Sequence, residues 1–499
     1  MIIGIDLGTT FSSMAYVDHE GAPNIIPNQE GARSTPSAIM IDEDEVVVGE
    51  IAKESAIIDD SNVVQHIKNE MGNNHYNYRN KDGDSYSPEE LSAFILKKLK
   101  QDSEDFLGTD INEAVITVPA YFTDAQRKAT QDAGHIAGLK VRKIINEPTA
   151  AAILFAKSNK IKSGNILVYD LGGGTFDVSI ISYSPDEISV KSTDGIRMLG
   201  GHFFDRELVE LVAEYLDEKH DIDIFDEEYI DELQGINQKL EECKIHLSTR
   251  KKTTISIKIG NIRERIKITR DDFEKRIAKY YMRTEYVVKN ALKSADMDWD
   301  DIDKVLMIGG STRIPYIRES LEKLCGKPLS YEANPDEAVA LGAAIQASLL
   351  EDETEETTKV VDVSSHSLGI VILDAKTGKY ANEIMIRRNS ILPTQYKREF
   401  YTSDHRQEVV TLRITEGEYK DIEDVTIVGS FDIDLPPNLD KGTKVEIKMG
   451  LDEEQLITIH TRIEEVADFF KEIHFNRESN MDKDQVEKKR DLLANLEVS

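Results

Sequence analysis

The feature that most constrains the fold of this 499-residue chain is an internal repeat. The segments "IGIDLGTTFSSMAYV" (3–17) and "LVYDLGGGTFDVSII" (167–181) share one order: apolar residues, Asp-Leu-Gly, small residues, Thr-Phe, and a second apolar run. A second pair of segments, "NEPTAAAI" (146–153) and "NPDEAVALGAAI" (334–345), repeats later in each half. Because two separate elements recur in the same order, duplication is favoured over coincidence between common turn sequences.

Residues 1–163 and 164–350 are therefore predicted to be two copies of one α/β unit. Each copy alternates strand patterns with helical patterns, which is the signature of an α/β domain. Two related lobes that face each other form a cleft, and ligands usually bind in such clefts. The charged region 225–300 is predicted to be largely helical, with a short strand pair at 253–269.

The pattern changes after residue 350. Residues 351–366 are predicted to be an acidic and then apolar linker, with "VVDV" (360–363) as a short apolar patch in an exposed context. Alternating strand patterns over 367–470 predict an antiparallel β-sandwich domain. The polar tail 471–499 holds one short helical pattern, 482–496.

Composition excludes several classes of protein. The net charge is -32, which argues against nucleic acid as a partner because phosphate contacts require clusters of Lys and Arg. The two cysteines lack the spacing of a disulfide framework or a zinc site. The N-terminus has no signal-peptide pattern and no apolar run is long enough to span a bilayer. The expected location is the cytoplasm, with no membrane contact.

Each repeat places an aspartate at a strand end before a Gly/Thr-rich turn. Backbone N–H groups in such turns can point at phosphate oxygens, and only small residues permit the approach. Asp6 and Asp170 would then face each other across the cleft, and Mg²⁺ suits the space between carboxylates and phosphates. An ordinary hairpin turn is the alternative for either turn alone. A third turn, "MIGGSTRIP" (307–315), could offer the amides of Gly309, Gly310 and Ser311, and the chain has no P-loop motif.

Several segments resemble the seventy-kilodalton heat-shock chaperones, the DnaK-like family. The resemblance covers about 350 residues in the right order, and the segments that carry it are "IDLGTTFSS", "VPAYFTDAQRKAT", "INEPTAAA", "YDLGGGTFD", "GGSTRIP" and "NPDEAVALGAA". It implies an actin-like duplicated ATPase domain followed by a β-sandwich peptide-binding domain. It also implies ATP or ADP with Mg²⁺ as cofactors, and it allows K⁺ beside them.

The resemblance implies roles for residues of the cleft. Asp6 and Asp170 would hold Mg²⁺ through water. Lys68, Glu147, Asp170, Thr175 and Asp177 would position the attacking water and the γ-phosphate. A solvated surface lysine is the alternative for Lys68. The nucleotide would be held by residues of the signature segments and of two further segments, 199–205 and 241–248: Gly8, Thr9, Thr10, Phe11, Gly172, Gly173, Gly174, Thr175, Gly200, Gly201, Glu241, Lys244, Ser248, Gly309, Gly310, Ser311, Arg313 and Asp336.

Two further groups of residues are implied outside the cleft. The elements that couple the cleft to the linker would be Pro119, Arg127, Lys143, Val360, Val361, Asp362 and Val363. The peptide pocket would be lined by Leu368, Ile370, Phe400, Val410 and Leu412, for which ordinary sandwich core is an equal alternative. Unfolded polypeptides, a J-type co-chaperone and a nucleotide exchange factor are the expected partners.

The chain departs from the family pattern in four places. His202 and Phe203 stand where acidic residues are usual near the cleft, which puts nucleotide exchange or affinity in question. Lys143 replaces the usual arginine and cannot form the same bidentate fork. "SSH" (364–366) stands where a proline is common. The tail predicts no helical lid over the peptide groove, so bound peptide is expected to leave quickly.

Three functions are compatible with these observations. The first is an ATP-dependent chaperone, in which ATP docks the linker between the lobes and hydrolysis releases it. The second is another actin-like ATPase, such as a small-molecule kinase or a filament protein, which would lack the β domain and the "VVDV" linker. The third is a nucleotide-gated adaptor for one dedicated partner, suggested by the divergent β domain and the missing lid.

Overall fold

Residues 1–163 and 164–350 each form one large sheet, and the second sheet also takes in β19 (Lys359–Val361) of the linker. In the computed structural model, each lobe contains a six-stranded sheet. The structure describes every residue except 43–44, 57–59, 82, 160–162, 332–333, 352–357, 375, 464–465, 467–468, 475–480 and 495. In lobe I, β1 (Ile2–Asp6) pairs with β2 (Phe11–Val17) antiparallel and with β10 (Glu113–Val118) parallel. In lobe II, β12 (Gly164–Leu171) pairs in the same way with β13 (Phe176–Tyr183) and β17 (Lys304–Ile308). The sequence repeat is therefore also a repeat of topology.

The outer strands complete the two sheets, which differ in the sixth strand. Lobe I adds β3 (Pro23–Ile26), β4 (Thr35–Pro36) and β11 (Lys140–Asn146). Lobe II adds β14 (Glu187–Ile196), β18 (Leu329–Ser330) and β19. As the sixth strand, β4 pairs with β2 antiparallel, whereas β19 pairs with β14 in parallel. The central strands are almost wholly buried, as expected of strands covered on both faces.

The second repeated segment forms the helices at the junction of the lobes. These helices are α4 (Glu147–Asn159) and α9 (Ala338–Glu351), which pack against each other. A Cβ at Gly342 would lie 1.8 Å from the Ala150 carbonyl oxygen, so only glycine allows this approach. The repeated small residues thus set the distance between the lobes.

The remaining helices cover the sheets or extend the lobes. Lobe I carries α1 (Glu50–Ser55), α2 (Pro88–Leu107) and α3 (Asp124–Ile136), and α3 begins with a capping box between Thr123 and Gln126. Lobe II carries α5 (Gly201–His220), α6 (Ile230–Thr249), α7 (Arg270–Ser294) and α8 (Pro315–Cys325), with the predicted strand pair as β15 (Lys252–Ile259) and β16 (Ile262–Thr269). Short 3₁₀ turns lie at Asp60–Asn62, Ile67–Glu70 (η2), Glu227–Tyr229, Trp299–Asp301, Gly310–Arg313 and Ile422–Asp424.

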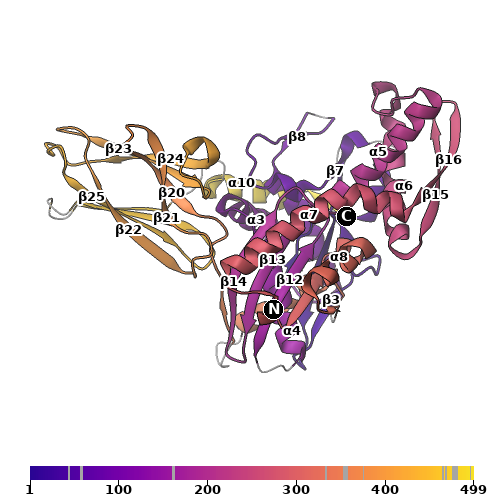
Figure 1. Cartoon of the computed structure of the whole chain (residues 1–499), viewed down its shortest axis with the longest axis horizontal. Coiled ribbons are helices and arrows are strands. Elements are labelled where there is room, and N and C mark those ends of the chain that lie inside the picture. Colours follow the sequence, from indigo (N-terminus) through magenta and orange to yellow (C-terminus); the bar gives the residue numbers. More distant parts are fainter. Residues whose placement is uncertain are drawn as a thin grey trace.

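The β domain is a sandwich of two four-stranded sheets. One sheet contains β20 (Leu368–Leu373), β21 (Tyr380–Ile386), β23 (Val409–Glu416) and β24 (Thr426–Asp434). The other contains β22 (Thr394–Tyr401), β25 (Lys444–Leu451), β26 (Ile457–Ile463) and β27 (Phe470–His474), so the sandwich continues past residue 470. The domain lies at one end of the molecule, and α5, α6, β15 and β16 lie at the other (Figure 1).

Part of the linker forms a strand, and two of its apolar side chains are buried, contrary to the prediction. Residue 351 ends α9, and residues 352–357 lie outside the described residues. Residues 359–361 form β19, which pairs in parallel with the edge strand β14. Val361 and Val363 are buried, so the prediction of an exposed apolar patch is wrong for both side chains. Val361 extends a sheet of lobe II, and Val363 forms an isolated bridge with Ile391, which removes both side chains from water.

The chain returns to lobe I after the sandwich. We call residues 481–499 the C-terminal segment; it contains α10 (Lys483–Ala494), which packs on α3, and β28 (Glu497–Val498). β28 pairs in parallel with β6 (Glu45–Val48) of a small sheet that also holds β5 (Ala38–Ile41) and β7 (Val63–Gln65). A hairpin of β8 (Tyr78–Arg79) and β9 (Ser85–Tyr86) lies in the same lobe.

Side chains of the C-terminal segment enter the core of lobe I. Leu493 and Val498 are buried in that core, and the Lys97 Nζ donates hydrogen bonds to the carbonyl oxygens of Leu493 and Leu496. The sequence predicted the helix but gave no sign of its contact with lobe I.

Within the described residues, none of the helices combines the length and apolar character needed to cross a bilayer.

Replacing Leu493 by Ala should loosen the C-terminal segment. Leu493 is 4% exposed and the adjacent Leu492 is 55% exposed, so Leu492→Ala is a matched control. We expect Leu493→Ala to cost about 2 kcal/mol and Leu492→Ala less than about 0.5 kcal/mol. Hydrogen exchange at the Ser499 amide, which donates to the Val46 carbonyl oxygen, measures the opening. Equal exchange rates in the two variants would contradict the assigned packing.

Candidate functional site

A cavity of about 990 Å³ lies between the two lobes. Most of the predicted nucleotide-site residues line it, and they come from both Gly/Thr-rich turns, from α6 and from the turn after β17. The predicted residues in its wall are Asp6, Gly8, Thr9, Thr10, Phe11, Lys68, Glu147, Asp170, Gly172, Gly173, Thr175, Gly201, Glu241, Lys244, Ser248, Gly309, Gly310, Ser311, Arg313 and Asp336.

Three predicted residues, Gly174, Gly200 and Asp177, are not in the wall of the cavity but lie directly behind it. Gly200 packs on the backbone of the glycine turn, where an added Cβ would be 2.6 Å from the carbonyl carbon of Gly173. An added Cβ at Gly173 would in turn lie 2.0 Å from the Thr10 Oγ1 of lobe I. The glycines thus permit the turns of the two lobes to touch.

Four carboxylates gather at the base of the cavity around one lysine. Lys68 is 5% exposed, and its Nζ lies 2.5 Å from the Glu147 Oε1, so a solvated surface lysine is excluded. The Asp170 and Asp177 side chains are also buried nearby, and Asp6 is half-buried beside them. Burial, and then repulsion from Glu147, raises the pKa of Asp6 and of Asp177 to about 7 and raises that of Asp170.

This charge pattern fits a cation that is held partly through water. The described residues contain no group of three or more His, Cys, Asp or Glu arranged as direct metal ligands. Mg²⁺ commonly retains several waters and takes only one or two carboxylates together with phosphate oxygens. Asp6 and Asp170, one from each lobe, are the residues that would hold it, and its charge would relieve the repulsion between them.

The other side of the cavity contains polar groups of lobe II. Lys244 pairs with Asp205 (2.7 Å) and also donates to the Gly201 carbonyl oxygen (3.1 Å). Arg313 pairs with Asp336 (2.7 Å). These side chains surround a space next to the glycine turn, as expected for the predicted nucleoside pocket.

Some cavity residues were missed by the sequence reasoning. Lys53 of α1 pairs with Glu241 of α6 at 2.8 Å, so this ion pair joins the two lobes. His66 and His202 also line the cavity, with ring centroids 4.3 Å apart. His202 was noticed only as a departure from the family. Lys53 and His66 stand outside the repeated motifs, so no signal in the sequence indicated them.

The predicted coupling residues meet the linker. Asn146 donates to the Asp362 carboxylate (2.8 Å), beside the strand formed by Val360 and Val361. Arg127 is buried, and its guanidinium donates to the Ala120 carbonyl oxygen (3.3 Å), next to Pro119, and to the Ser365 Oγ (3.4 Å).

The pKa values of both Arg127 and Asp362 are shifted by their position at this interface. Burial lowers the pKa of Arg127 to about 10 and raises the pKa of Asp362, which Arg127 and Lys143 oppose by lowering it. The predicted coupling residues are thereby brought together at the contact between lobe I and the linker.

Tyr121 joins this interface to the cleft. Its backbone N–H donates to the Asp177 Oδ1 (2.9 Å), and its carbonyl oxygen lies 3.0 Å from the His366 Nε2. Its ring packs against the His366 ring and under the Arg388 guanidinium, with centroid distances of 4.2 Å and 5.3 Å. Arg388 also pairs with Asp194 of β14 (2.7 Å). One residue of lobe I therefore contacts both a cleft carboxylate and the β domain.

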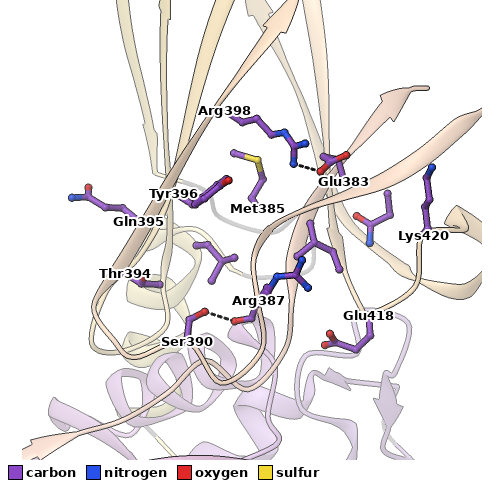
Figure 2. Close-up of a pocket in the computed structure, with 13 residues that line it drawn as sticks. Glu383, Met385, Arg387, Ser390, Thr394, Gln395, Tyr396, Arg398, Glu418 and Lys420 are labelled. Atoms are coloured by element: carbon purple, nitrogen blue, oxygen red, sulfur yellow. Dashed lines mark hydrogen bonds and ion pairs between the residues drawn. The ribbon is translucent and has the colours of Figure 1, made fainter. Parts of the chain in front are cut away.

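The predicted peptide-pocket residues lie in the sandwich core. Leu368, Ile370 and Leu412 are buried there, and Phe400 and Val410 are partly buried against the same core. A cavity of about 460 Å³ in this domain is lined instead by β21, β22 and neighbouring residues, including Met385, Arg387 and Tyr396 (Figure 2). The five residues as peptide contacts remain a prediction.

Replacing Asp6 by Asn should stabilise the nucleotide-free protein at alkaline pH. The folded-state pKa of Asp6 is about 7, above the ordinary value of 3.8, so its contribution to stability is full below pH 3.8 and is lost as the pH rises through 7. Asn cannot ionise, so the variant should gain about 2–4 kcal/mol at pH 8 and almost nothing at pH 4.

Urea unfolding at the two pH values measures this difference. The exposed Asp110, changed to Asn, is the control and should alter neither value. A gain that is the same at pH 4 and pH 8 would show that ionisation of Asp6 is not its cause.

Comparisons with known proteins agree with this geometry. The family model described as "Hsp70 protein" matches residues 2–494. The chain is 39% identical over 473 residues to "Chaperone protein DnaK" of Thermosipho melanesiensis, covering 92% of this chain and 78% of the relative. It is 38% identical over 465 residues to "Chaperone protein DnaK" of Halobacterium salinarum (strain ATCC 29341 / DSM 671 / R1), covering 92% and 72%.

These matches confirm three predictions: the family resemblance, the fold class, and chaperone ATPase activity as the class of function. They favour this class over a small-molecule kinase or a filament protein. The chain belongs to the Hsp70 family.

Proposed function

We propose that this ATP-dependent chaperone holds extended apolar peptide segments in its β domain and couples their binding to ATP hydrolysis through the linker. The observation that carries the proposal is the docking of the linker. β19 extends the sheet of lobe II, and Tyr121 contacts Asp177, His366 and Arg388 together. A ligand that moves the cleft carboxylates relative to Tyr121 would change the contact with the β domain, and by linkage peptide would affect the ATPase.

Residues of the cleft have distinct roles in the proposed hydrolysis. The amides of the two Gly/Thr-rich turns would bind the phosphates, and Lys68, oriented by Glu147, would contact the γ-phosphate and the attacking water. Mg²⁺, when bound between Asp6 and Asp170, would neutralise charge on the phosphates. Glu147 and Asp177 would orient water near it, Thr175 would contact the phosphates, and K⁺ could share the site.

The docked arrangement of the linker is proposed to be the ATP-bound form. Hydrolysis would release β19 from β14 and separate the β domain from lobe I. Unfolded polypeptides would be the substrates, and a J-type co-chaperone and an exchange factor would control the cycle in the cytoplasm. Coupling of this kind needs two states that each ligand prefers differently.

A nucleotide-gated adaptor for one dedicated partner is the second candidate. It is favoured by the β domain, where the predicted peptide residues are core and the described cavity is elsewhere. A panel of unrelated unfolded peptides separates the two functions, because a chaperone binds many of them and an adaptor binds few.

Replacing Val361 by Asp should uncouple peptide from hydrolysis. Val361 is buried in β19, and an unpaired carboxylate there would disfavour docking of the linker. In the unchanged protein, steady-state ATP hydrolysis should rise several-fold on addition of a short extended apolar peptide, and Val361→Asp should abolish that rise. Lys359→Asp, at an exposed position of the same strand, is the matched control and should keep it.

An ATPase rate that ignores peptide in the unchanged protein would contradict the chaperone proposal. It would leave a nucleotide switch whose β domain serves another partner.

Replacing Arg388 by Ala should shift the protein towards the undocked form. The guanidinium pairs with Asp194 and donates to the Thr193 carbonyl oxygen, so both groups would lose a partner at the interface. We expect a loss of about 2–3 kcal/mol of docking free energy, or about 30- to 150-fold in the docking equilibrium.

Protease cleavage within residues 351–366, or fluorescence transfer between labels on lobe II and the β domain, reports this equilibrium. Arg387→Ala is the control, since Arg387 lines the β-domain cavity (Figure 2). Similar shifts in both variants would show that the contact between Arg388 and lobe II does not hold the domains together.

A further inference from the structure

We propose that His66 and His202 form a clasp between the lobes that retains nucleotide at neutral pH and releases it on acidification. Both are positioning residues for nucleotide retention, and the inference rests on the proposed nucleotide site. His66 belongs to lobe I and His202 to lobe II, and both line the cavity. The ring centroids are 4.3 Å apart with an interplanar angle of 37°.

Each histidine is attached to a turn that would touch the phosphates. His66 precedes η2, two residues before Lys68, and is held in the left-handed region at φ 60°. His202 is the second residue of α5, and its N–H donates to the Gly173 carbonyl oxygen (2.8 Å). The contact between the rings therefore joins the Lys68 turn of lobe I to the glycine turn of lobe II.

A second interlobe contact lies beside the rings. The Lys53–Glu241 ion pair joins α1 to α6 at 2.8 Å, so the clasp and this ion pair connect the same two lobes. The left-handed conformation at His66 is unusual for a residue other than glycine and is of the kind found where surrounding contacts determine it. Lobes joined in this way must separate before a nucleotide held between them can leave.

The charged groups around the rings disfavour protonation while the lobes are closed. Three elements face them: α1 with Lys53, α5 with Asp205 and Arg206, and α6 with Glu241 and Lys244. Burial, followed by the neighbouring His202 ring, lowers the pKa of His66 to about 4, and burial followed by Arg206 lowers that of His202. Glu241 opposes both shifts, but its carboxylate already pairs with Lys53.

The direction of the pH effect follows from these shifts. Two neutral rings can stack, whereas a protonated ring would be charged in a partly buried position near Lys53 and Lys244. Opening the lobes returns each ring to water, where its pKa is about 6.5. Closure is therefore fully favoured above pH 6.5 and weakens as the pH falls towards 4. One histidine with these two values weakens closure about tenfold at pH 5.5.

The test is the dissociation rate of a fluorescent ADP analogue, with Mg²⁺, from the full chain at pH 7.5, 6.5 and 5.5. In the unchanged protein the rate should rise about tenfold or more between pH 7.5 and pH 5.5. His66→Phe and His202→Phe keep an aromatic ring but cannot ionise, so each should release slowly at pH 7.5 and show a smaller rise. His202→Ala, which removes the contact, should release quickly at every pH.

His75→Phe is the matched control, because His75 is exposed on the same lobe and should leave the pH profile unchanged. Asp6, Glu147, Asp170 and Asp177 are present in all these variants, so differences between the profiles report on the histidine pair. A Phe variant with the full pH-dependent rise would overturn the clasp. Failure of the unchanged protein to bind the analogue at any pH would instead overturn the proposed nucleotide site.

Discussion

The arrangement of the molecule depends on buried negative charge between its lobes. Asp6 and Glu147 come from lobe I and Asp170 and Asp177 from lobe II, and in the described part of the chain Lys68 is the cation that pairs with one of them, at Glu147. One lysine leaves an excess of negative charge in a position shielded from water. A metal ion that arrives with a nucleotide would balance that excess, so the closed cleft and the bound ligand would stabilise each other.

The cleft carboxylates are linked to the β domain through direct contacts of Tyr121. Tyr121 donates to Asp177 on one side and contacts His366 and Arg388 on the other. The linker adds β19 to the edge of lobe II, and the C-terminal segment adds β28 to a sheet of lobe I. The β domain is thus attached at its two ends to different lobes, so a rotation of the lobes would act on both attachments.

The duplicated lobes and most of the cleft could be predicted, because they depend on local patterns. An Asp-Gly turn after a buried strand has few conformations, and its repetition places Asp6 and Asp170 in equivalent positions. The linker could not be predicted in the same way. Val361 and Val363 are apolar in a polar context; Val361 is buried because β19 pairs with the edge of β14, and Val363 because it bridges to Ile391 and packs in a core cluster. Sequence alone also could not decide whether Leu368, Ile370 and Leu412 are core or pocket, because this depends on what packs against them in the folded domain.

The sequence by itself determined the two lobes, the Gly/Thr-rich turns and the family, since these follow from residue types at fixed local spacing. Only the tertiary structure decided what lies between distant segments: the Lys68–Glu147 pair, the contact of His66 with His202, and the packing of Leu493 in lobe I. Each of these joins residues far apart in the chain. Their distances are set by how the lobes and domains pack, which a local pattern does not encode.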